Sequence, residues 1–152
     1  MHIKRTLKKI VSGGQTGVDR AALDVALKCK IVCGGWCPNG RIAEDGIIPK
    51  RYPLKETESS DYEIRTEWNV KDSDGTLVLN EGELTGGTAF TVECAKKHKK
   101  PYLIVDLDNC SANVLDAFWN WIEKNNIKIL NMAGPRESKL QGIYKIAKKF
   151  LE

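Results

Sequence analysis

The stretch that decides the fold is Ser12-Gly-Gly-Gln-Thr-Gly-Val-Asp-Arg20, which directly follows the apolar run Leu7–Val11. The apolar run predicts a buried strand, and Val18–Lys28 predicts a helix because its apolar residues keep helical spacing. A glycine-rich turn between the two lets a ligand approach the backbone, and it leaves the first amides of the helix free for an anion. The stretch therefore predicts a strand, an anion-binding turn and a helix.

Short apolar runs and helical patterns alternate along the rest of the chain, which predicts an α/β fold with a mainly parallel sheet. Further strands are expected at Ile31–Gly35, Thr76–Leu79, Tyr102–Asp106 and Lys128–Asn131. Further helices are expected over Asp61–Lys71 with Ser59 or Ser60 as cap, from Thr88 to Lys99, from a Ser111 cap to Asn125, and from Leu140 to Leu151. With no linker and no repeat, the 152 residues predict a single three-layer domain around five strands.

Three strand-to-helix turns share one design, in which glycine or another small residue is followed by a hydroxyl residue near a helix start: Ser12–Gly17, Thr85–Thr88 and Gly134–Ser138. Each signal alone is weak, because glycine after a strand is often needed only for a tight turn. In a sequential strand order, 2-1-3-4-5, the last turn would lie ~14 Å from the first. In the order 2-1-5-3-4 all three turns line one crevice at the carboxyl ends of the strands. We therefore predict the order 2-1-5-3-4.

The residues of these turns and their flanks form the predicted ligand-binding set. The set comprises Gly13, Gly14, Gln15, Thr16, Gly17, Asp19, Thr85, Gly86, Gly87, Thr88, Asn131, Gly134, Pro135, Arg136 and Ser138. For Asp19, at the start of a helix, stabilisation of the helix dipole remains an equal alternative to a ligand role.

The irregular stretch Trp36–Ser60 is longer than an ordinary connection, which indicates a functional loop. Its candidates for contact with the ligand are Trp36, Arg41, Glu44, Asp45 and Lys50. A charge-rich surface loop is the alternative for the charged residues, and the tryptophan can either stack on a ligand ring or pack beneath the loop.

Composition narrows the classes of partner. The chain has 24 Lys and Arg against 20 Asp and Glu, a net charge of +4, and its basic clusters at 96–100 and 145–149 fall where helices are expected to end. Cations there complement the helix dipole, so we disfavour a nucleic-acid partner. No apolar run approaches the ~20 residues that span a bilayer, and no secretory signal is visible, so we expect a cytoplasmic protein without a membrane partner.

The five cysteines show no disulfide spacing, which agrees with a reducing compartment. Cys29, Cys33 and Cys37 recur every fourth residue. On the strand expected there, residues four apart are ~13 Å from one another, too far for one tetrahedral zinc ion. No structural metal site is predicted.

Six segments carry a family resemblance: Ser12–Asp24, Cys37–Pro49, Tyr52–Thr57, Arg65–Val70, Gly86–Thr88 and Asn131–Ser138. On these motifs the chain resembles the putative molybdenum carrier family, the circularly permuted YpsA branch of the SLOG superfamily of Rossmann-like, nucleotide-related ligand binders. The resemblance implies a Rossmann-like fold and a phosphorylated small-molecule partner, either the pterin-based molybdenum cofactor or a nucleotide. The permutation also supports the order 2-1-5-3-4, because the last strand would take the place of a relative's first.

A more distant similarity, to the lysine-decarboxylase-like phosphoribohydrolases, raises a second function. Their motif Gly-Gly-x-Gly-Thr-x-x-Glu is matched here by Gly86, Gly87 and Glu93, but Ala89 and Phe90 replace its second Gly and its Thr. The similarity implies that Arg65 would orient a phosphate or ribose while Glu93 supports an attacking water. Hydrolysis of nucleotides therefore stands as the alternative to binding and carriage, with a solvent-facing Glu93 as the structural interpretation.

An exposed tryptophan is expected on the helix that follows Ser111. Trp119 and Trp121 point about 200° apart on a helix, so only one is expected to face the core. With Phe118 on the same helix, the outward tryptophan predicts a homo-oligomer.

Overall fold

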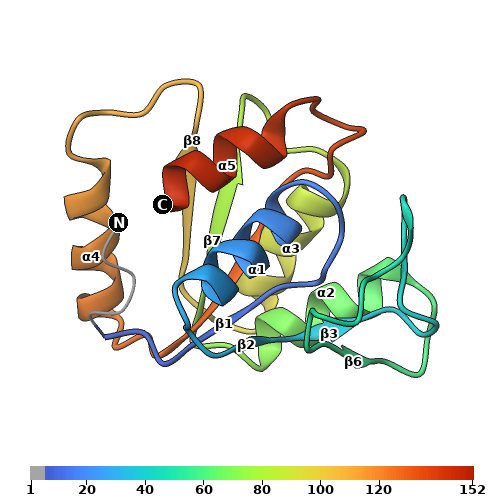
Figure 1. Cartoon of the computed structure of the whole chain (residues 1–152). Coiled ribbons are helices and arrows are strands. Elements are labelled where there is room, and N and C mark those ends of the chain that lie inside the picture. The colour runs from blue at the N-terminus through green and yellow to red at the C-terminus, as the bar shows by residue number, and fades with distance from the viewer. Residues whose placement is uncertain (1–5) are drawn as a thin grey trace.

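The computed structural model describes residues 6–152 and contains a central sheet flanked by helices (Figure 1). The sheet consists of β1 (Lys9–Val11), β2 (Cys33–Gly34), β7 (Gly75–Asn80), β8 (Tyr102–Asp106) and β9 (Ile129–Ala133). The helices are α1 (Val18–Lys28), α2 (Tyr62–Lys71), α3 (Gly86–Lys97), α4 (Val114–Lys124) and α5 (Ile143–Leu151).

The central sheet has the order β2-β1-β9-β7-β8, and all of its neighbouring strands are parallel. The strands β3 to β6 lie outside this sheet, so its five strands, counted along the chain, have the predicted order 2-1-5-3-4. The last strand pairs with β1, where Val11 is opposite Asn131, and with β7, where Thr76 is opposite Asn131. The carboxyl ends of β1, β9 and β7 are therefore adjacent.

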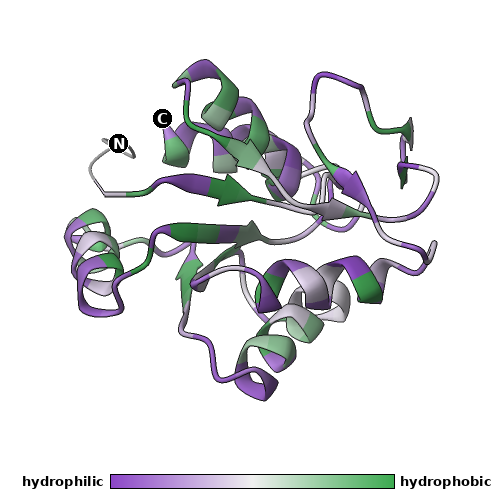
Figure 2. Ribbon diagram, turned by 90° about the horizontal axis from the view of Figure 1, so that it is seen from below, coloured by the Kyte–Doolittle hydropathy of each residue, from purple (hydrophilic) through white to green (hydrophobic). Residues whose placement is uncertain are grey.

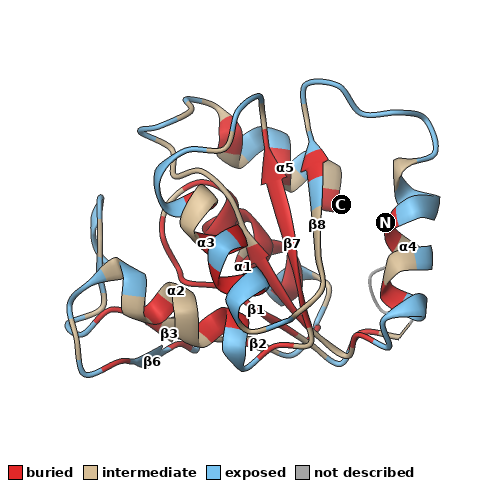
Figure 3. Ribbon diagram, turned by 180° about the vertical axis from the view of Figure 1, so that it is seen from behind, coloured by how far each residue is buried: buried red, intermediate tan, exposed pale blue. Residues whose placement is uncertain are grey.

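Helices cover both faces of the sheet. In Figure 1, α1 and α5 pack together in front of the sheet, whereas Figure 3 shows α2 and α3 on the other side. The strand β7 is buried over its whole length (Figure 3). Figure 2 shows hydrophobic residues concentrated on the strands between the helices. The larger core cluster joins Leu77 of β7 to Phe118 of α4 and Ile143 of α5, and a smaller one contains Val70, Cys94 and Ala95 between α2 and α3.

The long connection 36–60 is more ordered than predicted. Its strand β3 (Trp36–Cys37) pairs in parallel with β6 (Lys55–Glu56), and β4 (Ile42–Ala43) forms an antiparallel hairpin with β5 (Gly46–Ile47). A separate apolar cluster attaches this region to α1, and its buried members are Leu23, Cys37, Ile48, Tyr52 and Leu54. The connection therefore forms a fixed extension of the domain beside the first turn.

Several predicted element boundaries are wrong. Ser111 does not cap a helix, because α4 begins at Val114 and the hydroxyl of Ser111 donates to the side chain of Asn113. Leu140 lies in the turn before α5, which begins only after Gly142, where φ is 88°. Residues with left-handed backbone conformation interrupt a helix, so this turn could not be read from apolar spacing alone.

The remaining boundary corrections are small. The expected strand 31–35 is reduced to the two residues of β2, and the first strand begins at Lys9 rather than Leu7. The helix α3 ends at Lys97, and Asp61, rather than a serine, occupies the cap position of α2. Ends of short elements depend on tertiary hydrogen bonds that local sequence does not specify.

Both tryptophans of α4 contact the core side of the helix. The rings of Trp119 and Trp121 lie 5.0 and 6.3 Å from the ring of Phe118, and both side chains pack against the larger core cluster. The expectation that only one could face the core is wrong, because an indole is long enough to reach the core from the flank of a helix. Within residues 6–152, no helix is long and apolar enough to cross a membrane.

We predict that the contact between the first and last turns is essential for stability. A Cβ at Gly17, where φ is 81°, would lie 2.3 Å from the carbonyl oxygen of Pro135, whereas Gly82, with φ of 72°, has nothing within 4 Å. Gly82→Ala should cost about 1 kcal/mol of backbone strain, and Gly17→Ala should cost roughly 1–3 kcal/mol more. Urea unfolding of both variants measures the difference, and equal destabilisation would contradict the prediction.

Candidate functional site

A cavity of about 530 Å³ lies at the carboxyl ends of β1, β9 and β7. Residues of all three predicted turns line it: Gly13, Gln15 and Asp19 from the first, Thr85, Gly86, Gly87 and Thr88 from the second, and Asn131, Gly134, Pro135 and Arg136 from the third. The structure thus brings most of the predicted set together. Four members do not line this cavity, namely Gly14, Thr16, Gly17 and Ser138.

Two of these four are glycines with a structural role. Gly14 has φ of 78°, and a Cβ there would lie 2.5 Å from the side chain of Leu54. Gly17 meets the carbonyl of Pro135, as described above. Both positions hold the first turn against neighbouring segments, so their conformations shape the cavity from outside.

Arg65, from α2, crosses to the first turn. Arg65 is only 8% exposed. It donates hydrogen bonds from Nη1 to the carbonyl of Gly13 (2.8 Å) and from Nε to the hydroxyl of Thr66 (3.0 Å). Its guanidinium carbon lies over the ring of Tyr62, 5.2 Å from the ring centroid. In the part of the chain that the structure describes, Arg65 forms no ion pair with a carboxylate. The guanidinium interacts electrostatically with the buried carboxyl of Asp19, whose pKa it acts to lower, without forming a direct ion pair with it. A buried guanidinium of this kind is suited to an anionic ligand.

Gln15 lines the cavity and carries a buried side-chain donor. Its Oε1 accepts the amides of Thr16 (3.1 Å) and Glu44 (2.9 Å), which fixes the orientation of the side-chain amide. Its Nε2 is buried and has no hydrogen-bond partner, although the residue lines the cavity and is only 6% exposed. An unsatisfied buried donor costs about 1–3 kcal/mol, and an acceptor on a ligand would remove that cost.

Asp19 is the buried carboxylate of the cavity. Burial raises its pKa to about 6, although Arg65, the amide of Gln15 and Arg20 act in the opposite direction. The amide of Gln15 donates to its Oδ2 at 3.2 Å. The side chain therefore belongs both to the first turn and to the cavity wall.

The opposite wall is the beginning of α3. Nothing lies within 4 Å of the position where Gly87 would carry a Cβ, and the amides of the first turn of a helix are free to donate. Lys139 approaches Gly86 from the third turn, its Nζ 3.2 Å from the position that a Cβ would take on Gly86. This wall therefore combines helix amides with a flexible cationic side chain, a combination suited to an oxyanion.

Sequence analysis missed several cavity residues, among them Tyr62, Asn80, Phe90 and Lys139. Tyr62 and Phe90 supply flat apolar surface at the cavity wall, on α2 and α3 respectively. The replacement of a motif threonine by Phe90 was the available signal, because an aromatic side chain in a polar motif points to ring contact.

The five loop candidates do not line this cavity: Trp36, Arg41, Glu44, Asp45 and Lys50. Trp36 packs edge-on against Trp68 and donates from Nε1 to Asp72 (2.9 Å), so it supports the loop.

The charged candidates also bind other parts of the chain. Arg41 donates to four backbone carbonyls, and Asp45 forms a two-point ion pair with Arg20. Lys50 is exposed. The carboxylate of Glu44 accepts hydrogen bonds from the hydroxyls of Thr16 and Ser138.

Arg65 and Glu93 do not come together. Glu93 is exposed on α3 and is absent from the cavity wall, which uses the first six residues of that helix except Ala89. The pair that the phosphoribohydrolase motif implies is therefore divided between a buried and a solvent-facing position.

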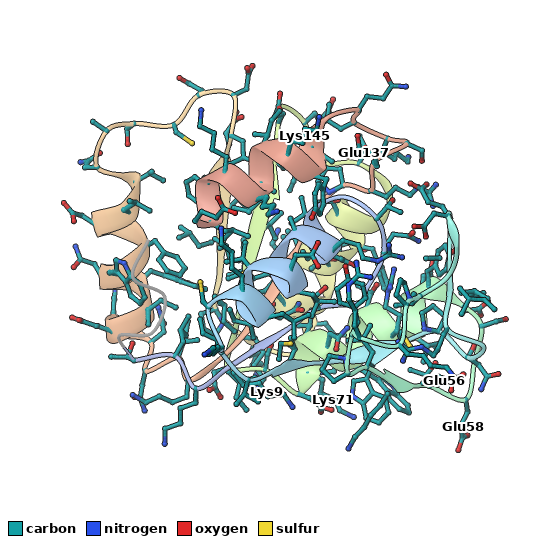
Figure 4. The ribbon with its side chains drawn as sticks, in the orientation of Figure 1. Lys9, Glu56, Glu58, Lys71, Glu137 and Lys145 are labelled. Atoms are coloured by element: carbon teal, nitrogen blue, oxygen red, sulfur yellow. The ribbon has the colours of Figure 1, made fainter. Side chains whose placement is uncertain are left out.

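A second cavity, of about 470 Å³, lies between α1, α5 and the long connection. Its acidic groups are occupied: Asp24 accepts the hydroxyls of Tyr52 and Tyr144, and Glu137 accepts the amides of Gly142 and Tyr144 at the start of α5. Figure 4 shows Glu137 and Lys145 beside the beginning of that helix. The first cavity, which contains a buried donor without a hydrogen-bond partner among the described residues, is the stronger candidate site.

Among residues 6–152, no three His, Cys, Asp or Glu side chains group to hold a metal ion.

A parallel sheet whose glycine-containing turns surround one cavity at the carboxyl ends of its strands defines a Rossmann-like domain. Residues 10–152 match the circularly permutated YpsA SLOG family, and the chain belongs to that family. The crystal structure of a putative molybdenum carrier protein from Syntrophus aciditrophicus SB is similar, with 48% identity, a TM-score of 0.92, and coverage of 96% of this chain and 93% of that one. No protein of curated function matches the sequence. The family expected from the motifs is confirmed.

Asp19 predicts a specific pH dependence of stability. Because its folded pKa of about 6 lies above its ordinary value, the folded state binds the proton more tightly, and the free energy of unfolding should fall as the pH rises from about 4 to about 6. Asp19→Asn cannot ionise and should remove this fall, which amounts to roughly 3 kcal/mol at most. Urea unfolding between pH 4 and 7 measures it, with Asp108→Asn as the matched substitution at an exposed turn. A constant difference between wild type and Asp19→Asn would show that Asp19 is not the group responsible.

Proposed function

We propose that this chain binds a phosphorylated small molecule with a flat ring, of the nucleotide or pterin class, and carries, stores or senses it. The observation that carries the proposal is the convergence of Arg65, a buried cation that forms no direct ion pair among residues 6–152, with the open start of α3 in one cavity. The volume of about 530 Å³ lies within the ordinary range of small-molecule pockets.

The phosphate has donors on two sides of the cavity. Arg65 supplies a guanidinium whose Nη2 has no partner among the described hydrogen bonds, and the first turn of α3 supplies backbone amides beside Gly87. Lys139 adds a second cation at the rim. A bidentate guanidinium together with helix amides is a common way to hold a phosphate group.

For the ring of the ligand, the cavity offers apolar walls and a directional hydrogen-bond donor. Tyr62 and Phe90 offer aromatic surface, and the Nε2 of Gln15 offers a hydrogen bond to a ring carbonyl or nitrogen. Purines and pterins both carry such acceptors on a flat ring. This arrangement supports a heterocyclic ligand rather than a free sugar phosphate.

Among such ligands we favour the molybdenum cofactor, a phosphorylated pterin. The structural neighbour is named a putative molybdenum carrier protein, and it is similar to almost the whole of this chain. The donors of the cavity fit the phosphate and the pterin ring, whereas no cluster of metal-ligating side chains lies in the described part of the chain. The protein would therefore hold the cofactor through its organic part. A cytoplasmic setting suits the five free cysteines.

Hydrolysis of a nucleotide is the less favoured function. The carboxylate that the motif comparison supplies, Glu93, faces solvent and is not at the cavity. A general acid or base must come within hydrogen-bonding reach of the reacting atoms. Carriage needs only the binding groups that the cavity does contain.

Binding of AMP and of adenosine, measured by isothermal titration calorimetry, tests the role of Arg65. AMP should bind more tightly than adenosine, and Arg65→Gln should weaken AMP binding roughly tenfold or more, because a hydrogen-bonded charge is worth about 1.5–3 kcal/mol. Arg51→Gln, at an exposed arginine outside this cavity, is the matched control and should bind as wild type does.

A second variant covers the case in which Arg65→Gln destabilises the first turn. Gly87→Val adds bulk where the structure has open space, so it should fold and yet fail to bind AMP. Equal affinity for AMP and adenosine would show that the phosphate is not recognised. Native mass spectrometry of the chain purified without added ligand, followed by analysis of the released molecule, then distinguishes a pterin from a nucleotide.

A further inference from the structure

Glu44, at the tip of the β4–β5 hairpin, places its carboxylate among donors from two of the glycine-containing turns. The hydroxyl of Thr16 donates to its Oε2, the amide of Ser138 donates to the same oxygen at 3.1 Å, and the hydroxyl of Ser138 donates to Oε1. The Nε of Arg136 lies 3.5 Å from Oε1. One carboxylate therefore occupies the convergence of three hydrogen-bond donors and a cation.

Thr16 and the backbone of the third turn are positioned by contacts that do not involve Glu44. The hydroxyl oxygen of Thr16 accepts the amide of Glu137 at 3.1 Å, which leaves its proton for an acceptor on the other side. The carbonyl of Pro135 accepts the amide of Val18 at 3.2 Å and ties the third turn to α1. The hydroxyl of Thr16 and the backbone of the third turn therefore form a preformed part of an anion site.

Glu44 fills this site incompletely. The Nε of Arg136 is buried and has no hydrogen-bond partner within residues 6–152, although the carboxylate lies within ion-pair distance. A carboxylate offers two oxygens in one plane, whereas a phosphate or another tetrahedral oxyanion directs oxygens in more directions and can satisfy the guanidinium as well. The buried unpartnered donor points to a larger anion than the one present.

We propose that Glu44 is a placeholder in an oxyanion site formed by Thr16, Ser138 and Arg136, and that a tetrahedral oxyanion binds there when the Glu44 side chain turns into solvent. The site lies beside the main cavity, because Arg136 lines that cavity while Thr16 and Ser138 do not. It is a second anion subsite and does not depend on the phosphate position proposed for Arg65.

The exchange requires movement of one side chain only. The backbone of the hairpin stays in place through the bond from the Glu44 amide to Gln15 (2.9 Å) and the ion pair of Asp45 with Arg20 (2.9 Å). Burial acts to raise the pKa of Glu44, but hydrogen bonds from Ser138 and Thr16 hold it below its ordinary value. The side chain is therefore charged at neutral pH and competes directly with an incoming anion.

Titration with inorganic phosphate, followed through the backbone amide of Ser138 by ¹⁵N NMR, tests the proposal. Glu44→Ala removes the competing carboxylate and should raise the affinity at Ser138 roughly tenfold, because phosphate no longer has to displace a hydrogen-bonded charged group. The double variant Glu44→Ala/Thr16→Val loses a donor and should reverse most of the gain.

Asp45→Ala is the matched control, because it loosens the same hairpin while leaving Glu44 in the site. It should give no gain in phosphate affinity at Ser138. An equal gain in Asp45→Ala, or no gain in Glu44→Ala, would overturn the proposal and leave Glu44 as an anchor of the hairpin.

Two further titrations identify the source of the oxyanion. Molybdate, a free tetrahedral oxyanion, should shift the Ser138 amide whether or not the Gly87 amide responds. If AMP shifts both amides together, the oxyanion of the subsite belongs to the ligand of the main cavity. Arg65→Gln separates the two proposals, since it should abolish the response at Gly87 and preserve the response to inorganic phosphate at Ser138.

Discussion

The pairing of β9 between β1 and β7 is the constraint on which the rest of the structure depends. It places the ends of three strands side by side, and with them the three turns that surround the cavity. The close approach of Gly17 to Pro135 then seals the first turn against the third. With β9 at the edge of the sheet, the third turn would lie too far away to share a ligand with the first.

Much of this arrangement could be predicted from the sequence, because parallel α/β folds follow a small set of rules. Alternating apolar runs predicted the strands, and the requirement that three similar turns share one crevice predicted the strand order. The start of α4 and the turn around Leu140 could not be predicted. A hydrogen bond between the side chains of Ser111 and Asn113 precedes the start of α4, and the left-handed backbone of Gly142 precedes the start of α5. Neither feature leaves a periodic signal in the sequence.

The site was predictable to a different degree in its different parts. Backbone turns carry glycine signatures, so most of the predicted turn residues do reach the cavity. The site residues on the helices were harder to predict from the sequence. The packing of α2 on α3 decides that Tyr62 and Phe90 face the cavity while Glu93 faces solvent. Glu44 was expected to contact a ligand, but its hydrogen bond with Thr16 could not be predicted. That contact depends on a hairpin that brings together residues 28 positions apart, which no local pattern encodes.

The position of β9 also has a consequence for how the chain is made. Lys9 of β1 pairs with Ile129, so β1 has no partner on that side until β9, 120 residues further along the chain, has been synthesised. Until then β1 and β7 both expose the strand edge that β9 covers, and the contact between Gly17 and Pro135 is missing. Long-range parallel pairing of this kind folds slowly and leaves such edges open to aggregation. The cavity is therefore complete only once β9 and the turn that follows it have been synthesised and paired.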